Sequence, residues 1–85
     1  MNVGDFEERV WELEAIRIVI RASAATQIGD YGRQNAAPET QSVTEWIRTR
    51  ITPNAGGHDV IVLGGNGEEP HGRTLIRTLR ESYLA

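Results

Sequence analysis

AIRIVIRA, residues 15–22, carries the clearest structural signal in this sequence. Isoleucine occupies every second position, and the positions between are mostly arginine. This period of two is typical of a β-strand with one buried face and one exposed face. The inward set is Ile16, Ile18 and Ile20, and the outward set is Arg17, Val19 and Arg21. We therefore predict a strand over residues 15–22.

The segment before this strand, residues 5–14, fits two structures. As a strand it pairs with residues 16–21 across a turn at Glu14-Ala15, which sets apolar residues opposite apolar ones and acidic residues opposite arginines. The alternative is a helix with a capping pair and an apolar stripe, namely Asp5 with Glu8, and Phe6, Val10 and Leu13. We favour the hairpin for its cross-strand pairs, although Glu-Ala is a poor hairpin turn.

A long polar connection follows the strand. Residues 23–41 are small and polar, with two glycines and Pro38 among them. Connections of this length are uncommon in compact domains and are usually functional or mobile. We expect this segment to be the most mobile part of the chain, with Ile28 and Tyr31 attaching it to the core.

Three further elements follow the connection. A helix begins after Ser42, which forms a capping box with Glu45, and it ends near Pro53. Its apolar stripe consists of Val43, Trp46, Ile47 and Ile51. Residues 59–63 contain the apolar run VIVL, which predicts a buried strand, and residues 73–84 predict a last helix. The inner face of that helix consists of Leu75, Ile76, Leu79 and Tyr83.

These elements predict an α+β fold. We expect a small two-layer sandwich, in which a two- or three-stranded sheet with an N-terminal hairpin carries two helices on one face. The order of elements is ββαβα, or αβαβα if residues 5–14 are helical. Residues 1–85 are expected to form a single domain. Trp11 and Trp46 each belong to an apolar stripe, so both are assigned to the core.

The composition excludes several classes of site. The 85 residues include no cysteine and no lysine, and all nine basic residues are arginine. This excludes disulfides, cysteine nucleophiles, cysteine zinc sites, Schiff-base lysines and Walker-type phosphate loops. No apolar run is long enough to span a membrane, and residues 1–9 are too acidic and polar for a signal peptide. We expect a cytoplasmic protein that does not bind membranes.

The charge distribution suggests one local anion site. The net charge of −3 argues against a general nucleic-acid binder, because counterion release requires many cations that face phosphates. Arg73, Arg77 and Arg80 recur at spacings of four and three on the last predicted helix. Together with His71 they are the alternative site, which would bind an anionic ligand or a nucleic-acid segment. A solvated helix face is the simpler interpretation of the same stripe.

No catalytic, cofactor or metal site is predicted. The two histidines, His58 and His71, lie thirteen residues apart and lack the spacing of metal ligands. The glycine-rich loop over residues 64–72 lacks a GxGxxG pattern and carries Glu68 and Glu69, which repel phosphate. We interpret this loop as a flexible turn in which glycines adopt positive φ angles.

The uncovered face of the sheet is the predicted binding surface. The VIVL strand offers apolar side chains to both faces, whereas the two helices cover only one. We therefore expect a non-catalytic protein–protein interaction or accessory module, which forms a homodimer or docks on a protein partner through this face. The expected contact residues are Arg17, Val19, Arg21, Val60 and Val62.

Overall fold

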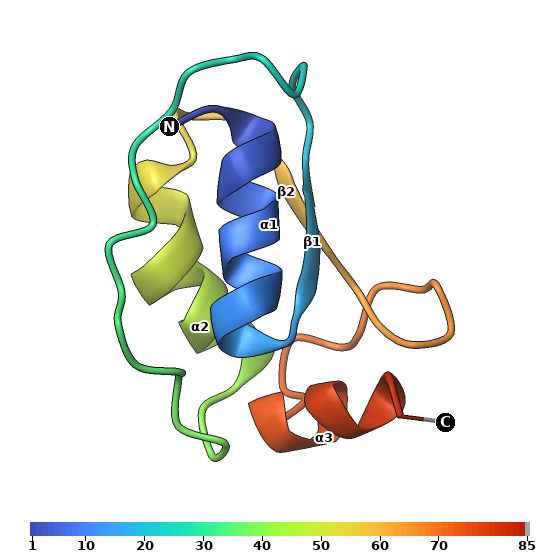
Figure 1. Cartoon of the computed structure of the whole chain (residues 1–85). Coiled ribbons are helices and arrows are strands. Elements are labelled where there is room, and N and C mark those ends of the chain that lie inside the picture. Colours follow the sequence, from blue (N-terminus) through green and yellow to red (C-terminus); the bar gives the residue numbers. More distant parts are fainter. Residues whose placement is uncertain (85) are drawn as a thin grey trace.

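Three α-helices and a two-stranded antiparallel sheet are the main elements of the part of the chain that the structure describes (Figure 1). The structure is a computed structural model, and it describes residues 1–84. The helices are α1 (Val3–Glu14), α2 (Val43–Trp46) and α3 (Ile76–Ser82), and the strands are β1 (Arg17–Ile20) and β2 (Val60–Leu63). Beyond α2 the chain continues through a π-helical turn, η1 (Ile47–Ile51), and a 3-10 turn, η2 (Thr52–Asn54).

The segment before β1 is a helix, so the predicted N-terminal hairpin is wrong. The side chain of Asn2 caps α1 by accepting a hydrogen bond of 2.7 Å from the Asp5 amide. Phe6 and Val10 are fully buried, as in the helical alternative. Ala15 ends α1 in the left-handed conformation, with φ of 55°. Glutamate, arginine and leucine favour helices, and this preference together with the buried stripe prevails over cross-strand pairing.

The register of the sheet fixes which residues share a face. Arg17 pairs with Leu63, and Val19 pairs with Ile61, so these four side chains lie on one face. The opposite face carries Ile18, Ile20, Val60 and Val62. Ile16, Ile18 and Ile20 are all buried, which confirms the inward set predicted from the sequence.

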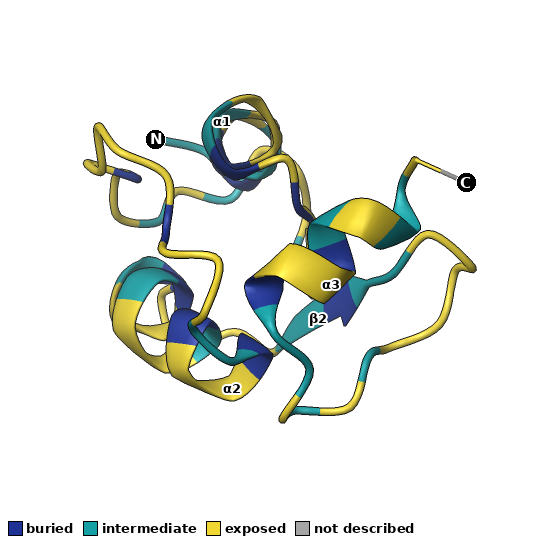
Figure 2. Cartoon of the chain, turned by 90° about the horizontal axis from the view of Figure 1, so that it is seen from below, coloured by how far each residue is buried: buried dark blue, intermediate teal, exposed yellow. Residues whose placement is uncertain are grey.

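The core lies between the inner face of the sheet and the three helices. Trp46, Phe6 and Ile51 are among its largest fully buried side chains. Figure 2 shows that the buried sides of the helices face a common centre. Trp46 is therefore a core residue as predicted, whereas Trp11 is 40% exposed, contrary to its assignment to the core.

The second helical region begins as predicted and ends differently. The hydroxyl of Ser42 accepts a hydrogen bond of 3.2 Å from the Glu45 amide, which confirms the predicted N-cap. The chain then widens into η1 and tightens into η2, which contains Pro53. The last helix is shorter than predicted, because residues 73–75 are not helical. Leu75 instead forms an isolated bridge with Ser42, which ties the start of α3 to the start of α2.

The arrangement of helices is less layered than predicted. Figure 1 shows α1 and α2 beside the sheet, with α3 across one end of it. The sequence had instead predicted that the helices corresponding to α2 and α3 lie side by side over one face of the sheet. The chain is a small compact α+β domain, and within residues 1–84 no helix has the length and apolar character needed to cross a membrane.

Candidate functional site

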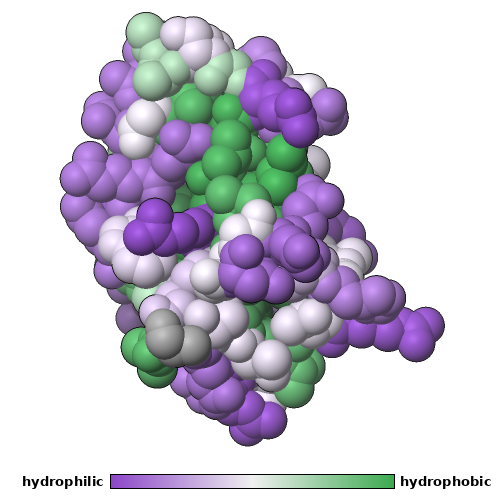
Figure 3. All heavy atoms as spheres, turned by 90° about the vertical axis from the view of Figure 1, so that its right-hand side faces the viewer, coloured by the Kyte–Doolittle hydropathy of each residue, from purple (hydrophilic) through white to green (hydrophobic). Residues whose placement is uncertain are grey.

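The outer face of the sheet exposes apolar side chains from both strands. Val19 is 40% exposed, and Ile61 and Leu63 beside it are partly exposed. Figure 3 views the molecule from the side of the sheet and shows a band of hydrophobic atoms bordered by hydrophilic ones. An exposed apolar band with a polar border is typical of a surface that binds another protein.

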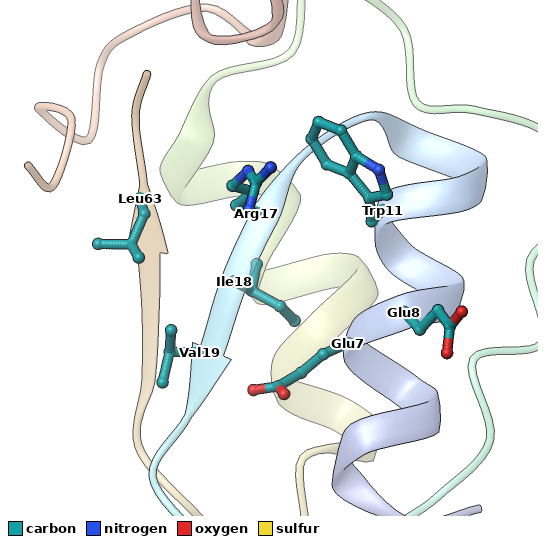
Figure 4. Close-up of a pocket in the computed structure, with 7 residues that line it drawn as sticks. All are labelled: Glu7, Glu8, Trp11, Arg17, Ile18, Val19 and Leu63. Carbon is teal, nitrogen blue, oxygen red and sulfur yellow. The ribbon is translucent and has the colours of Figure 1, made fainter. Parts of the chain in front are cut away.

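A groove between α1 and β1 continues this apolar band. Figure 4 shows the residues that line it, which are Glu7, Glu8, Trp11, Arg17, Ile18, Val19 and Leu63. The guanidinium carbon of Arg17 lies 4.7 Å from the centre of the Trp11 ring, a cation–π distance. This contact holds the indole in place at the edge of the sheet. Trp11 is thus a preordered aromatic side chain on the surface, and aromatic side chains of this kind often anchor interfaces.

Tyr83 joins the groove to the end of the sheet. Its ring meets Trp11 edge to face, with centroids 5.6 Å apart. Its hydroxyl accepts a hydrogen bond of 3.0 Å from the Arg17 amide and donates one to the Leu63 carbonyl. Burial raises the pKa of Tyr83, so the hydroxyl remains a donor at neutral pH. The residue after α3 therefore fixes the strand ends beside Trp11.

The structure divides the predicted contact residues between two faces. Arg17 and Val19 lie on the outer face, and the exposed Arg21 follows β1. Val62 is only 3% exposed and lies on the inner face, together with the partly buried Val60. Neither belongs to the outer surface, because the antiparallel register pairs them with Ile18 and Ile20.

Sequence reasoning missed three members of this surface: Ile61, Leu63 and Trp11. A continuous apolar run contains no alternation, so VIVL gives no sign of which residues point outward. The signal for Trp11 lay in the helical alternative for residues 5–14. On a helix, Trp11 falls outside the stripe of Phe6 and Val10.

The arginines of the alternative anion site do not form one stripe. Arg73 precedes α3, and its amide donates a hydrogen bond of 3.1 Å to Nδ1 of His71. Arg77 is exposed on α3. Arg80 turns inward, and its guanidinium donates to the carboxylate of Glu14 at 3.0 Å and to two backbone carbonyls. The predicted set is therefore separated by the bend before α3 and by the engagement of Arg80.

Arg80 belongs to a buried polar cluster around Glu14, which the sequence did not reveal. Glu14 is 1% exposed and pairs with Arg50 at 2.9 Å and Arg80 at 3.0 Å. Its carboxylate also accepts a hydrogen bond of 2.7 Å from the Ala37 amide. Tyr31 and Trp46 complete the set of side-chain donors. The cluster thus joins α1, the long connection, α2 with its π turn, and α3.

The surroundings of Glu14 keep it ionised. Burial raises the pKa of this carboxyl. The hydrogen bonds from Tyr31, Ala37 and Trp46 and the charge of Arg50 lower the pKa, and together they outweigh the effect of burial. The net shift is downward. Burial and the neighbouring carboxylate also raise the pKa of Tyr31. With every carboxylate oxygen occupied by donors, Glu14 acts as a structural anion and has little capacity left for proton transfer.

The glycine-rich loop uses its glycines differently from the prediction. Only Gly67 of its first three glycines adopts a positive φ, of 80°. Gly65 is needed for close packing, because a Cβ there would lie 1.7 Å from the carbonyl oxygen of Ser82. The Gly65 amide donates to the Ser82 hydroxyl at 2.9 Å, and the Gly64 amide donates to the Glu68 carbonyl at 2.8 Å. These amides are therefore engaged within the fold.

The exposed His58 and His71 take no part in a metal-ligand group. Among residues 1–84, no three histidine, aspartate or glutamate side chains gather closely enough to hold a metal ion. Comparison with protein-family models, curated proteins and solved structures gave no significant match to this chain.

Proposed function

We propose that this protein is a non-catalytic interaction module that binds a protein partner through the outer face of its sheet. The observation that carries this proposal is the partly exposed apolar band of Val19, Ile61 and Leu63 on the outer face of the sheet. Figure 3 shows hydrophobic atoms gathered on this side of the molecule. Arg17 and Trp11 border the band, so its apolar centre has a polar and aromatic edge. This composition is typical of a protein–protein interface.

The structural role of the buried charges supports an interaction module over an enzyme. Among residues 1–84, the buried titratable side chains are Glu14 and Tyr31, and each is engaged in the cluster that ties the helices together. Glu7 is engaged as well, since its carboxylate accepts a hydrogen bond of 2.8 Å from the Ile20 amide. The exposed side chains of the sheet surface and its rim take no part in this cluster and are available for recognition.

Substitution on two faces tests the proposal. The immobilised protein is compared with Val19→Glu, which places a charge in the apolar band, and with Arg77→Glu, which changes the exposed side of α3. Bound proteins from a cell extract are quantified by mass spectrometry. We expect Val19→Glu to weaken capture of the specific partner by about tenfold or more, as for an interface hot spot, and Arg77→Glu to leave it unchanged.

The reverse pattern would overturn the proposal. Loss of binding in Arg77→Glu with full binding in Val19→Glu would move the site to α3 and favour an anionic ligand or nucleic acid. Equal capture of the partner by the wild-type protein and both variants would show that the outer face of the sheet is not the binding surface. Circular dichroism of each variant confirms that the comparison is made between folded proteins.

A further inference from the structure

A surface hollow, here called the strand-end hollow, lies where the end of the sheet meets the glycine-rich loop. The residues that line it are Trp11, Arg17, Leu63, Gly64, Gly65, Gly67 and Tyr83. Its volume is about 400 Å³, within the range of sites that hold small ligands. Trp11, Arg17 and Leu63 also line the groove between α1 and β1. The hollow therefore continues the proposed binding surface around the end of the sheet.

The walls of the strand-end hollow are formed by aromatic rings and bare backbone. Trp11 and Tyr83 meet edge to face, with ring centroids 5.6 Å apart. Gly65 and Gly67 are exposed, and nothing lies within 4 Å of the place that a Cβ of Gly67 would occupy. Aromatic pairs contribute to binding beyond the area that they bury. These walls therefore favour a ligand with an aromatic ring.

Arg17 gives the strand-end hollow its charge. Among the described residues that line it, only Arg17 is charged, whereas Glu7 and Glu8 line the neighbouring groove. One face of its guanidinium lies over the Trp11 ring at 4.7 Å (Figure 4). Arg17 is exposed, and within residues 1–84 no carboxylate lies at ion-pair distance from it. Guanidinium groups stack on rings and bind carboxylates through their N–H edge, so Arg17 can bind both parts of an aromatic, anionic ligand.

The loop backbone favours a carboxylate over a phosphate as the anionic group. Phosphate sites in glycine-rich loops use several free backbone amides. Here the Gly64 amide donates to the Glu68 carbonyl at 2.8 Å, and the Gly67 amide donates to the Gly64 carbonyl at 2.9 Å. The Gly65 amide donates to the Ser82 hydroxyl at 2.9 Å. A single guanidinium without amide donors suits one carboxylate.

We propose that the strand-end hollow binds an aromatic side chain of the protein partner, and that Arg17 pairs with a carboxylate next to that ring. This inference rests on the proposed function and deepens it by giving the partner a chemistry. The partner segment carries a phenylalanine, tyrosine or tryptophan beside an aspartate or glutamate. The ring packs against the Trp11–Tyr83 pair and the glycine backbone, and the carboxylate accepts hydrogen bonds from the Arg17 guanidinium.

Titration with short peptides tests this chemistry directly. Acetyl-Phe-Glu-amide, acetyl-Phe-Lys-amide and acetyl-Leu-Glu-amide are each added to the isotope-labelled protein up to about 20 mM, and NMR shifts give dissociation constants. The Trp11 indole N–H reports on the hollow. The Trp46 indole N–H is the internal control, because it is buried and donates to Glu14. We expect acetyl-Phe-Glu-amide to shift the Trp11 signal and to leave the Trp46 signal unchanged.

The relative affinities and a charge reversal complete the test. Acetyl-Phe-Glu-amide should bind about fivefold more tightly than the lysine peptide, because an exposed ion pair contributes modestly, and about threefold more tightly than the leucine peptide. Arg17→Glu should invert the preference, so that the lysine peptide binds more tightly. Arg21→Glu makes the same charge change just beyond the other end of β1, outside the hollow, and should keep the wild-type preference. Circular dichroism confirms that both variants are folded.

Several results would overturn the inference. These are an unchanged Trp11 signal at the highest peptide concentration, equal affinity for the three peptides, and the same loss of preference in Arg21→Glu as in Arg17→Glu. Tighter binding of adenosine monophosphate than of acetyl-Phe-Glu-amide would assign the hollow to a nucleotide instead. Absence of peptide binding, together with loss of partner capture in Val19→Glu, would overturn this inference alone and leave the proposed function in place. Peptide binding with full partner capture in Val19→Glu would support the hollow and overturn the outer face as the partner's binding surface.

Discussion

Glu14 shows how much structure one buried carboxylate can organise. It receives two arginines, two aromatic donors and a backbone amide from three separate parts of the chain: the long connection, α2 with its π turn, and α3. Burying a charge is costly unless it is paired and fully hydrogen-bonded, and this cluster meets both conditions. Removing the charge leaves Arg50 and Arg80 partly buried without their partner, so the structure depends strongly on this residue.

The substitution Glu14→Gln should therefore lower the free energy of unfolding strongly. Breaking a buried ion pair by removing one partner typically costs about 3–5 kcal/mol, because the remaining charge stays desolvated. Urea denaturation followed by circular dichroism measures the change. Glu12→Gln is the control, since Glu12 is exposed on the same helix. A change no larger than that of the control would show that the cluster contributes little to stability.

The same carboxylate predicts a loss of stability in acid. The pKa of Glu14 is lower in the folded protein than its ordinary value of 4.5. A lowered folded pKa gives stability that is complete above the unfolded value and is lost as the pH falls through the folded value. The difference in unfolding free energy between wild type and Glu14→Gln should shrink as the pH falls below the ordinary value of 4.5 and through the lowered folded value. A difference that stays constant over this range would contradict the assignment.

Among the elements, α3 is short but belongs to the core. Its Ile76 and Leu79 are 0% and 2% exposed, and Arg80 on the next position reaches Glu14. The helix has only seven residues, so its stability must come from this packing, because isolated helices of such length do not persist in water.

Leu79→Ala should consequently destabilise the whole domain. Truncation of a buried leucine removes apolar contacts and leaves a cavity, at a cost of about 2–5 kcal/mol. The melting temperature and the urea midpoint both report this loss. Thr78→Ala on the exposed side of the same helix is the matched control and should change stability little. An unchanged melting temperature for Leu79→Ala would place α3 outside the cooperative core.

At the scale of the whole molecule, the long connection over residues 23–41 is attached to α1 near both of its ends. Figure 1 shows that it leaves the end of β1, passes the N-terminus and runs down beside α1 and α2. The Val3 amide donates to the Thr26 carbonyl at 2.9 Å, and the Ala37 amide donates to Glu14 at 2.7 Å. The structure thus supplies anchors at both ends of a segment that the sequence predicted to be mobile.

Amide hydrogen exchange can show which amides of residues 23–41 are protected by these hydrogen bonds. We expect slow exchange at Ala37, whose amide is buried and hydrogen-bonded, and fast exchange at the exposed residues 34–36 beside it. Glu14→Gln should accelerate exchange at Ala37, because the acceptor of its amide is altered and the domain is less stable. Uniformly fast exchange from 23 to 41 would instead support the original expectation of a mobile connection.

Local patterns were sufficient where one face of an element is buried and the other is solvated. The alternation in residues 15–22 correctly predicted β1 and its buried isoleucines, and Ser42 with Glu45 correctly marked the start of α2. These signals are local, because side-chain period and capping depend on residues a few positions apart. The α+β class followed from them.

Contacts between distant segments settled the rest. Whether residues 5–14 pair with β1 or pack on it as a helix depended on the burial of Phe6 and Val10, and the faces of VIVL depended on its register with β1. The inward turn of Arg80 depended on Glu14, a residue 66 positions away. No short-range pattern encodes such pairings, because the free energy of burying a charge or an apolar face depends on neighbours that only the folded chain brings together.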